Sequence, residues 1–281
     1  MAAPAAATDV CRQPVDLPVT LAEGVPLVRL TLGNKEVVLI LDTGAESTIV
    51  STNAADRLQL PRNMVYPRRL RGLGGGVVGG VVGLPGLAVG GLHLPNFGAL
   101  VGPIDLPKLG GFAPDGLLGA DILSDYDVDL DLAHGRVRLL CSVGEPDWGR
   151  PYSVIGANLS VHDRLFFGST LDGKKIAAII DTGAQHTVID SRAALAAGAD
   201  PQALRREPAK AVRGISGASG IEARPNRFHQ LVIGDETLPN PTLLVAPLDL
   251  EDADLIVGAD FLRDRRIRLS YRSHRIFLGR P

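Results

Sequence analysis

Short apolar runs separated by turn residues recur along the chain and predict a mostly β protein. Two pairs of runs each flank a turn dipeptide, which is Gly-Asn in the first pair and Asp-Gly in the second. The pairs are 27–32 with 37–41, and 164–171 with 174–180. Apolar runs of this length around such dipeptides are typical of β-hairpins. We therefore expect a hairpin early in each half of the chain.

Helix signals are sparse. The best candidates are residues 51–58 and 191–197. Two further short helical turns are expected to open at Asp121 and Asp260, because Asp is a favourable N-cap residue. Few short helices among many short strands again indicate a mostly β fold.

The two halves of the chain are copies of one another. Asp42 lies 77 residues before Gly119, and Asp181 lies 77 residues before Gly258. The same offset of 139 aligns further residues of identical or similar type. They are Asp115 with Asp254, Arg136 with Arg275, and Val137 with Ile276. A repeat of this length predicts two duplicated β lobes.

The tripeptide Asp-Thr-Gly occurs once in each copy, directly after an apolar run and before an Ala. The candidate active-site residues are Asp42, Thr43, Gly44, Ala45, Asp181, Thr182, Gly183 and Ala184. Two carboxyls held close together cannot both ionise easily, so the pair shares a proton. One carboxyl can then accept a proton from water while the other donates one to a carbonyl, without metal, cofactor or covalent intermediate.

The motif Asp-Thr-Gly-Ala-x-x-Thr, the Gly-rich segment after it and the later Gly resemble those of aspartic proteases, from about residue 21 onward. The Ala after the Gly is more similar to retropepsins than to pepsins. With both copies in one chain, the sequence resembles the two-lobed retropepsin-like proteases of bacteria. The resemblance implies a bilobal acid-protease (pepsin/retropepsin-like) fold and an aspartic endopeptidase with Asp42 and Asp181 as catalytic residues.

The resemblance also implies roles for the neighbouring turn residues. Thr43 and Thr182 are expected to hydrogen-bond across the lobes, and the two glycines to let the chain turn tightly. Ala45 and Ala184 stand where pepsins usually carry Ser or Thr. A hydroxyl there favours the ionised carboxylate, so its absence predicts a dyad that stays protonated to higher pH.

Two alternatives compete with a complete protease in one chain. The first is a catalytically silent peptide-binding module on the same fold, which retention of both Asp residues disfavours. The second is a site formed between two chains. Because one chain carries both copies, we expect a monomer that acts on a protein or peptide substrate.

Each copy contains a Gly-rich segment that is a candidate flap, at 71–80 and 213–220. Glycine lets a hairpin tip bend and lets backbone approach a peptide closely. The candidate substrate-binding residues are Gly72, Leu73, Gly74, Gly75, Gly214, Ile215, Ser216 and Gly217. The alternative for either segment is a mobile surface loop with no role.

A break in the pattern at 144–151 sets the expected domain boundaries. They are a leader at 1–20, an N-terminal retropepsin-like lobe at 21–146 and a C-terminal lobe at 147–281. A chain of 281 residues is long enough for two modest domains. Each lobe can therefore bury a core of its own.

The composition limits the classes of partner that we expect. The net charge of −2 gives no reason to expect nucleic acid. Arginines cluster at 263–268 around Asp264, and we expect a solvated or salt-bridged edge there rather than a nucleic-acid site. No apolar run reaches the roughly 18 residues that a membrane span needs. Six scattered His residues show no metal-ligand spacing.

The N-terminus and the two cysteines suggest a compartment. Residues 2–7 are Ala-rich and are consistent with what remains after signal cleavage, and Arg far outnumbers Lys, as in GC-rich bacterial genomes. A disulfide between Cys11 and Cys141 would suit an oxidising environment, although two free thiols are the alternative. We therefore expect a periplasmic or secreted protein, with a cytoplasmic one as the alternative.

Overall fold

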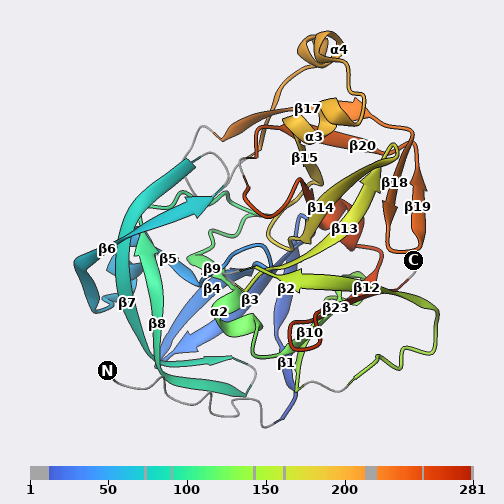
Figure 1. Ribbon diagram of the computed structural model, residues 1–281. Helices are drawn as coiled ribbons and strands as arrows, with labels where there is room; N and C mark the ends of the chain where they lie inside the picture. The colour runs from blue at the N-terminus through green and yellow to red at the C-terminus, as the bar shows by residue number, and fades with distance from the viewer. Residues whose placement is uncertain are drawn as a thin grey trace, which may run out of the picture.

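The computed structural model describes residues 13–72, 75–89, 91–141, 144–160, 163–212, 220–248 and 250–279. They form two lobes built mainly of β-strands, with a few short helices (Figure 1). The mostly β, bilobal fold expected from the sequence is confirmed.

The strands alternate along the chain with short turns. In the N-terminal half they are β1 (Val15–Leu17), β2 (Val19–Ala22), β3 (Val25–Leu32), β4 (Lys35–Leu41), β5 (Ile49–Ser51), β6 (Arg62–Gly72), β7 (Gly75–Val89), β8 (Leu92–Gly102), β9 (Gly116–Leu118), β10 (Asp127–Asp131) and β11 (Arg136–Leu140). In the C-terminal half they are β12 (Tyr152–Leu159), β13 (Leu165–Leu171), β14 (Lys174–Ile180), β15 (Val188–Asp190), β16 (Lys210–Val212), β17 (Ile221–Arg227), β18 (Gln230–Ile233), β19 (Glu236–Pro239), β20 (Thr242–Ala246), β21 (Leu255–Val257), β22 (Arg266–Ser270) and β23 (Arg275–Gly279).

Both lobes have the same strand order, so the duplication extends to topology. The N-terminal sheet runs β3-β4-β9-β5-β8-β7-β6, with β2 added at the edge of β3. The C-terminal sheet runs β13-β14-β21-β15-β20-β17-β16. In each lobe the strand before Asp-Thr-Gly pairs in parallel with the strand before the later Gly, Gly119 or Gly258. These pairs are β4 with β9 and β14 with β21. This pairing brings the two motifs of each copy together.

A third set of strands joins the lobes, in the order β1-β11-β10-β22-β23-β12. Its centre is the antiparallel pair β10 and β22, one strand from each half of the chain. Residues 15–20 of the expected leader contain β1 and the start of β2, which pair with β11 and β3. This part of the leader is therefore integral to the fold. Residues 144–151, the expected boundary, form an irregular segment before β12.

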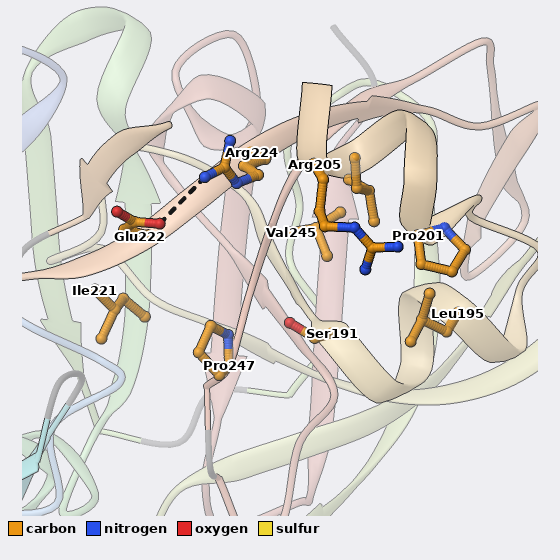
Figure 2. Close-up of a pocket in the computed structure, with 10 residues that line it drawn as sticks. Ser191, Leu195, Pro201, Arg205, Ile221, Glu222, Arg224, Val245 and Pro247 are labelled. Carbon is orange, nitrogen blue, oxygen red and sulfur yellow. Dashed lines mark hydrogen bonds and ion pairs between the residues drawn. The ribbon is translucent and has the colours of Figure 1, made fainter. Parts of the chain in front are cut away.

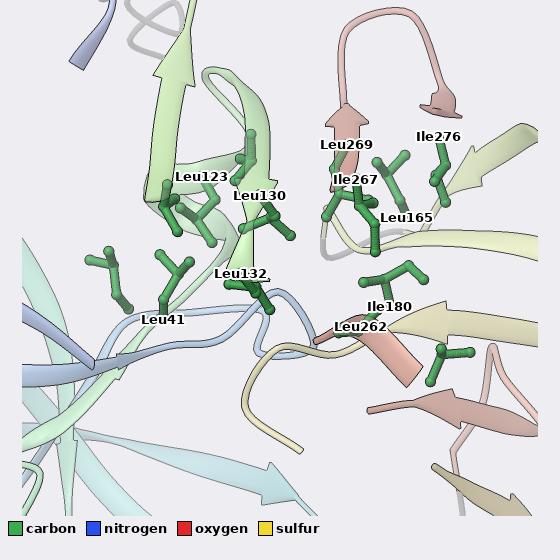
Figure 3. Close-up of a cluster of buried hydrophobic side chains, with 14 of the residues drawn as sticks. Leu41, Leu123, Leu130, Leu132, Leu165, Ile180, Leu262, Ile267, Leu269 and Ile276 are labelled. Carbon is green, nitrogen blue, oxygen red and sulfur yellow. The ribbon is translucent and has the colours of Figure 1, made fainter. Parts of the chain in front are cut away.

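Aliphatic side chains from both halves fill the core, as Figure 3 shows for part of it. Leu41 and Ile180 are the last residues of β4 and β14, and both are buried in this cluster. Each Asp-Thr-Gly turn therefore starts from a strand end that is fixed by core packing.

The helices are α1 (Thr52–Leu58), α2 (Ala120–Leu123), α3 (Ser191–Ala196), α4 (Pro201–Arg206) and α5 (Ala259–Leu262). The first and third confirm the helices expected at 51–58 and 191–197. Sequence reasoning missed α4, although an Asp N-cap followed by a Pro in the first turn is a helix-start signal.

The prediction that Asp121 and Asp260 are N-caps was wrong. The N-caps of α2 and α5 are Gly119 and Gly258, and neither cap makes a side-chain hydrogen bond. Asp121 and Asp260 lie inside the first turn instead. Their carboxylates bind partners far away in sequence, as described below.

A buried cluster of charged residues connects the lobes within this third set of strands, β1-β11-β10-β22-β23-β12, which we call the interlobe sheet. Asp129, on β10, is 2 % exposed. Its carboxylate accepts hydrogen bonds from Arg266 Nε at 2.9 Å, Arg268 Nη2 at 2.7 Å and Trp148 Nε1 at 3.2 Å. A further ion pair joins Arg265 to Glu236. The arginines at 263–268 are therefore salt-bridged, as expected, but Arg265 and Arg268 are buried and β22 lies between β10 and β23, so the expected edge is not present.

Two further expectations concern covalent and membrane features. Cys141 is disulfide-bonded, and its expected partner, Cys11, lies outside the described residues. Within the described part of the chain, no helix is long and apolar enough to cross a membrane.

Replacing Asp129 tests the interlobe cluster. Asp129→Ala leaves the buried Arg268 guanidinium without its carboxylate, and we expect a loss of about 3–5 kcal/mol in the free energy of unfolding. Asp16→Ala is the matched control, because the Asp16–Arg138 ion pair between β1 and β11 is exposed and should cost at most about 1 kcal/mol. Equal losses in urea denaturation would contradict a structural role for the buried cluster.

Candidate active site

Asp42 and Asp181 each follow the last residue of a core strand, β4 or β14, and begin a tight turn. The Oδ1 of Asp42 accepts hydrogen bonds from the N–H groups of Gly44 and Ala45, both at 2.9 Å. The Oδ1 of Asp181 accepts the equivalent bonds in the second copy, at 2.8 and 3.0 Å. Both Asp residues stay partly exposed, so water and a substrate can reach them.

Reciprocal hydrogen bonds between two threonines lock the turns together. The N–H of Thr43 donates to Oγ1 of Thr182 at 3.1 Å, and the N–H of Thr182 donates to Oγ1 of Thr43 at 3.2 Å. Each hydroxyl then donates to a carbonyl of the opposite lobe, Thr43 to Ile180 at 2.7 Å and Thr182 to Leu41 at 2.5 Å. Both threonines are buried. The cross-lobe bonding expected for this pair is present.

The glycines of the two turns make room for the opposite carboxyl. A Cβ on Gly44 would lie 2.6 Å from the Oδ2 of Asp181, and a Cβ on Gly183 would lie 2.7 Å from the Oδ2 of Asp42. Neither glycine has a positive φ. Close approach of the two carboxyls, and not an unusual turn conformation, is therefore what requires glycine here.

A second set of contacts braces each turn from behind. The Asp121 carboxylate accepts hydrogen bonds from the hydroxyl and the N–H of Thr48, at 2.7 and 2.9 Å. The Thr48 hydroxyl in turn accepts the N–H of Gly119 at 3.1 Å. Asp260 and Thr187 repeat this contact in the second copy, at 2.6 Å between side chains. Asp121 and Asp260, each two residues after the later Gly of its copy, thus support the Asp-Thr-Gly turns.

The environment makes the two carboxyls easy to protonate. Burial raises the pKa of Asp42 well above its ordinary value, and the neighbouring Asp181 raises it further through its charge and a hydrogen bond. Burial also raises the pKa of Asp181, but the hydrogen bond from Asp42, the turn N–H groups and the charge of Arg164 oppose that rise. The pair therefore keeps one shared proton at a pH where an ordinary carboxylic acid is ionised.

Comparison with known proteins agrees with this geometry. The sequence model of the aspartyl protease family matches residues 28–122 and, a second time, residues 168–261, and these segments cover more than half of the chain. The chain belongs to the aspartyl protease family. Its fold is similar to that of basic 7S globulin from soybean, with a TM-score of 0.53 and 12% identity over 95% of each chain. No curated protein sequence matches the chain.

The first candidate flap of this family member is a β-hairpin. Strands β6 and β7 pair antiparallel up to Gly72 opposite Gly75. Leu73 and Gly74 lie outside the described residues. Strands β16 and β17 form the equivalent hairpin, in which Val212 pairs with Ile221. The residues proposed at its tip, Gly214, Ile215, Ser216 and Gly217, also lie outside the described part.

An apolar cluster in each lobe connects the Asp-Thr-Gly turn to the hairpin, near the loop end of its two strands. In the N-terminal lobe, Ala45 and Val77 both pack against one cluster of buried aliphatic residues. In the C-terminal lobe, Ala184 and Val212 pack against another. The alanines after the two glycines thus belong to apolar surfaces, one in each lobe.

One charged side chain beside the dyad was not foreseen. Arg164 lies just before β13, and its Nη2 is 2.7 Å from Oδ1 of Asp252 and 3.2 Å from Oε1 of Glu46. Its Nη1 lies 3.5 Å from the carbonyl oxygen of Gly44. Sequence reasoning placed Arg164 only at the start of a strand, because no counterpart in the first copy marks it.

A separate pocket of about 420 Å³ lies in the C-terminal lobe between α3, α4 and β17 (Figure 2). Mainly apolar side chains line it, including Leu195, Pro201 and Ile221, and it contains neither Asp42 nor Asp181. It is therefore distinct from the dyad. Within the described residues, no group of three or more His, Cys, Asp or Glu side chains is placed to hold a metal ion.

Enlarging a catalytic-turn glycine tests the close approach of the carboxyls. Gly44→Ala places a methyl group against Asp181 and should displace it, and a misplacement near 1 Å lowers kcat by roughly 100-fold. Gly168→Ala is the control, because nothing lies within 4 Å of a Cβ at that position on β13. Wild-type activity in Gly44→Ala, with peptide hydrolysis as the assay, would show that the carboxyls do not lie this close.

Proposed function

We propose that this protein is an aspartic endopeptidase in which Asp42 and Asp181 activate one water molecule between them. The observation that carries the proposal is the cross-bonded pair of Asp-Thr-Gly turns, which sets two carboxyls of raised pKa against each other. Family and fold agree with hydrolysis of a peptide.

In the proposed reaction, the ionised Asp181 accepts a proton from the water while the water oxygen attacks the scissile carbonyl carbon. Asp42 donates its proton to the carbonyl oxygen, which gives a neutral tetrahedral diol. Asp181 then passes its proton to the amide nitrogen, the C–N bond breaks, and Asp42 takes back a proton from the diol. The dyad returns to its starting state, and no covalent intermediate forms.

The substrate we propose is an extended peptide held between the dyad and the two hairpins. The strand at Gly72 and Gly75 can add backbone hydrogen bonds to such a peptide. The apolar surfaces that include Ala45 and Ala184 lie beside the reacting carbonyl and favour apolar side chains there. We further propose that one chain suffices for activity, and that the disulfide at Cys141 reflects an oxidising compartment, periplasmic or extracellular.

Single substitutions in the dyad test the proposed mechanism. Asp42→Asn and Asp181→Asn should each lower kcat by about 10⁴-fold or more, and the double variant should be little worse, because the two groups act as a unit. Hydrolysis of a peptide library, followed by mass spectrometry, measures the loss. Asp16→Asn, at an exposed position of β1, is the control. Substantial hydrolysis by either dyad variant would exclude the assignment.

The raised pKa of Asp42 also predicts how stability depends on pH. The folded pKa lies above the unfolded value of about 3.9. Between these two values the folded protein binds more protons than the unfolded chain, so stability falls as pH rises through the window. Asp42→Asn removes this contribution.

Relative to wild type, Asp42→Asn should therefore gain free energy of unfolding as the pH rises from about 4 to about 7. Urea denaturation at the two pH values measures the difference between the proteins. If the variant instead loses stability relative to wild type at the higher pH, the Asp42 carboxyl is stabilised in its ionised form and the assigned direction is wrong.

A further inference from the structure

Arg164 crosses from the C-terminal lobe to the catalytic turn of the N-terminal lobe. Its side chain is only 12 % exposed. The guanidinium bridges Glu46, two residues after Gly44, to Asp252 in the C-terminal lobe, and approaches the Gly44 carbonyl oxygen. Among the described residues its buried Nε has no hydrogen-bond partner. The two carboxylates therefore do not satisfy the whole guanidinium.

The first copy of the repeat has no equivalent charge. The offset of 139 places Val25 opposite Arg164, and Val25 is a fully buried strand residue. Asp252 likewise corresponds to Ala113. The hydrogen bonds around the two catalytic carboxyls are otherwise the same in both copies to within about 0.1 Å. Arg164 thus makes an otherwise nearly symmetric site asymmetric.

We propose that Arg164 is a positioning residue whose charge, present beside one catalytic turn and absent from the other, makes the two catalytic carboxyls unequal. The proposal rests on the proposed function, because it concerns the same pair of carboxyls. A single cation on one side of a pair that shares one proton stabilises the ionised form of the nearer carboxylate.

The charged groups around the dyad agree with this asymmetry. The positive charge of Arg164 lowers the pKa of Asp181. Tyr271 is also buried, and burial together with the charges of Asp42 and Asp163 raises the pKa of its phenol. Tyr271 therefore stays neutral and adds no charge near Asp42. Glu46 and Asp252 face Arg164 and weaken its field.

This arrangement predicts shifts of opposite sign for the two partners of the ion pair. Arg164→Met removes the cation, so the first ionisation of the dyad should move to higher pH by roughly 0.5–1 unit, less than the 1–3 units of a direct Arg–Asp contact. The acidic limb of the kcat/KM profile should move with it. Asp252→Asn leaves Arg164 less compensated and should move both toward lower pH.

Two further variants separate charge from packing. Arg164→Lys keeps the charge and should restore most of the wild-type pH profile. Arg265→Met removes another buried arginine of an ion pair, the one that binds Glu236, and should leave the profile unmoved even if it lowers stability. A mere structural role for Arg164 would instead lower kcat at every pH without moving the limbs.

The decisive experiment combines the pH–rate profiles with ¹³C NMR titration of the aspartate carboxyls in all four variants and wild type. The expected result is a higher first ionisation of the dyad in Arg164→Met and a lower one in Asp252→Asn. An unmoved titration in both overturns the proposal. The NMR titration needs no turnover, so a wild type without hydrolysis would refute the proposed function alone, and the role of Arg164 would still be decided.

Discussion

Two threonine side chains, one from each lobe, hold the site in place. Thr43 and Thr182 exchange hydrogen bonds at 3.1 and 3.2 Å, and their hydroxyls donate to carbonyl oxygens of the opposite lobe. These bonds are possible because the interlobe sheet fixes the two halves and the core holds the ends of β4 and β14. The carboxyls can then come so close that only glycine fits beside each one.

Much of this arrangement is predictable from the sequence, because each motif occurs twice, once in each copy of the repeat. Repeated Asp-Thr-Gly turns, repeated hairpins and the constant spacing to Gly119 and Gly258 indicate both the fold and the dyad. Asp121 and Asp260 were misread because an Asp at a helix start is locally indistinguishable from an N-cap. Their actual partners, Thr48 and Thr187, lie 73 residues earlier, and only the fold brings them together.

What the sequence does not reveal is the asymmetry of the site. A repeat shows what the two copies share, whereas Arg164 and Asp252 occur in one copy only and match no motif. Their importance depends on a contact between lobes, in which Arg164 meets Glu46 and the Gly44 carbonyl. Such a contact has no local signature. The α4 helix also belongs to one copy, although its Asp200-Pro201 start could have been recognised.

The electrostatics follow from this geometry. Burial desolvates the dyad, and the mutual approach of the carboxyls opposes double ionisation. The central claim is that one proton is shared between Asp42 and Asp181. Neutron diffraction from deuterium-exchanged crystals at mildly acidic pH tests it most directly. We expect one deuterium between the two carboxyls; two carboxylates without a deuterium, or too far apart to share one, would contradict a shared proton.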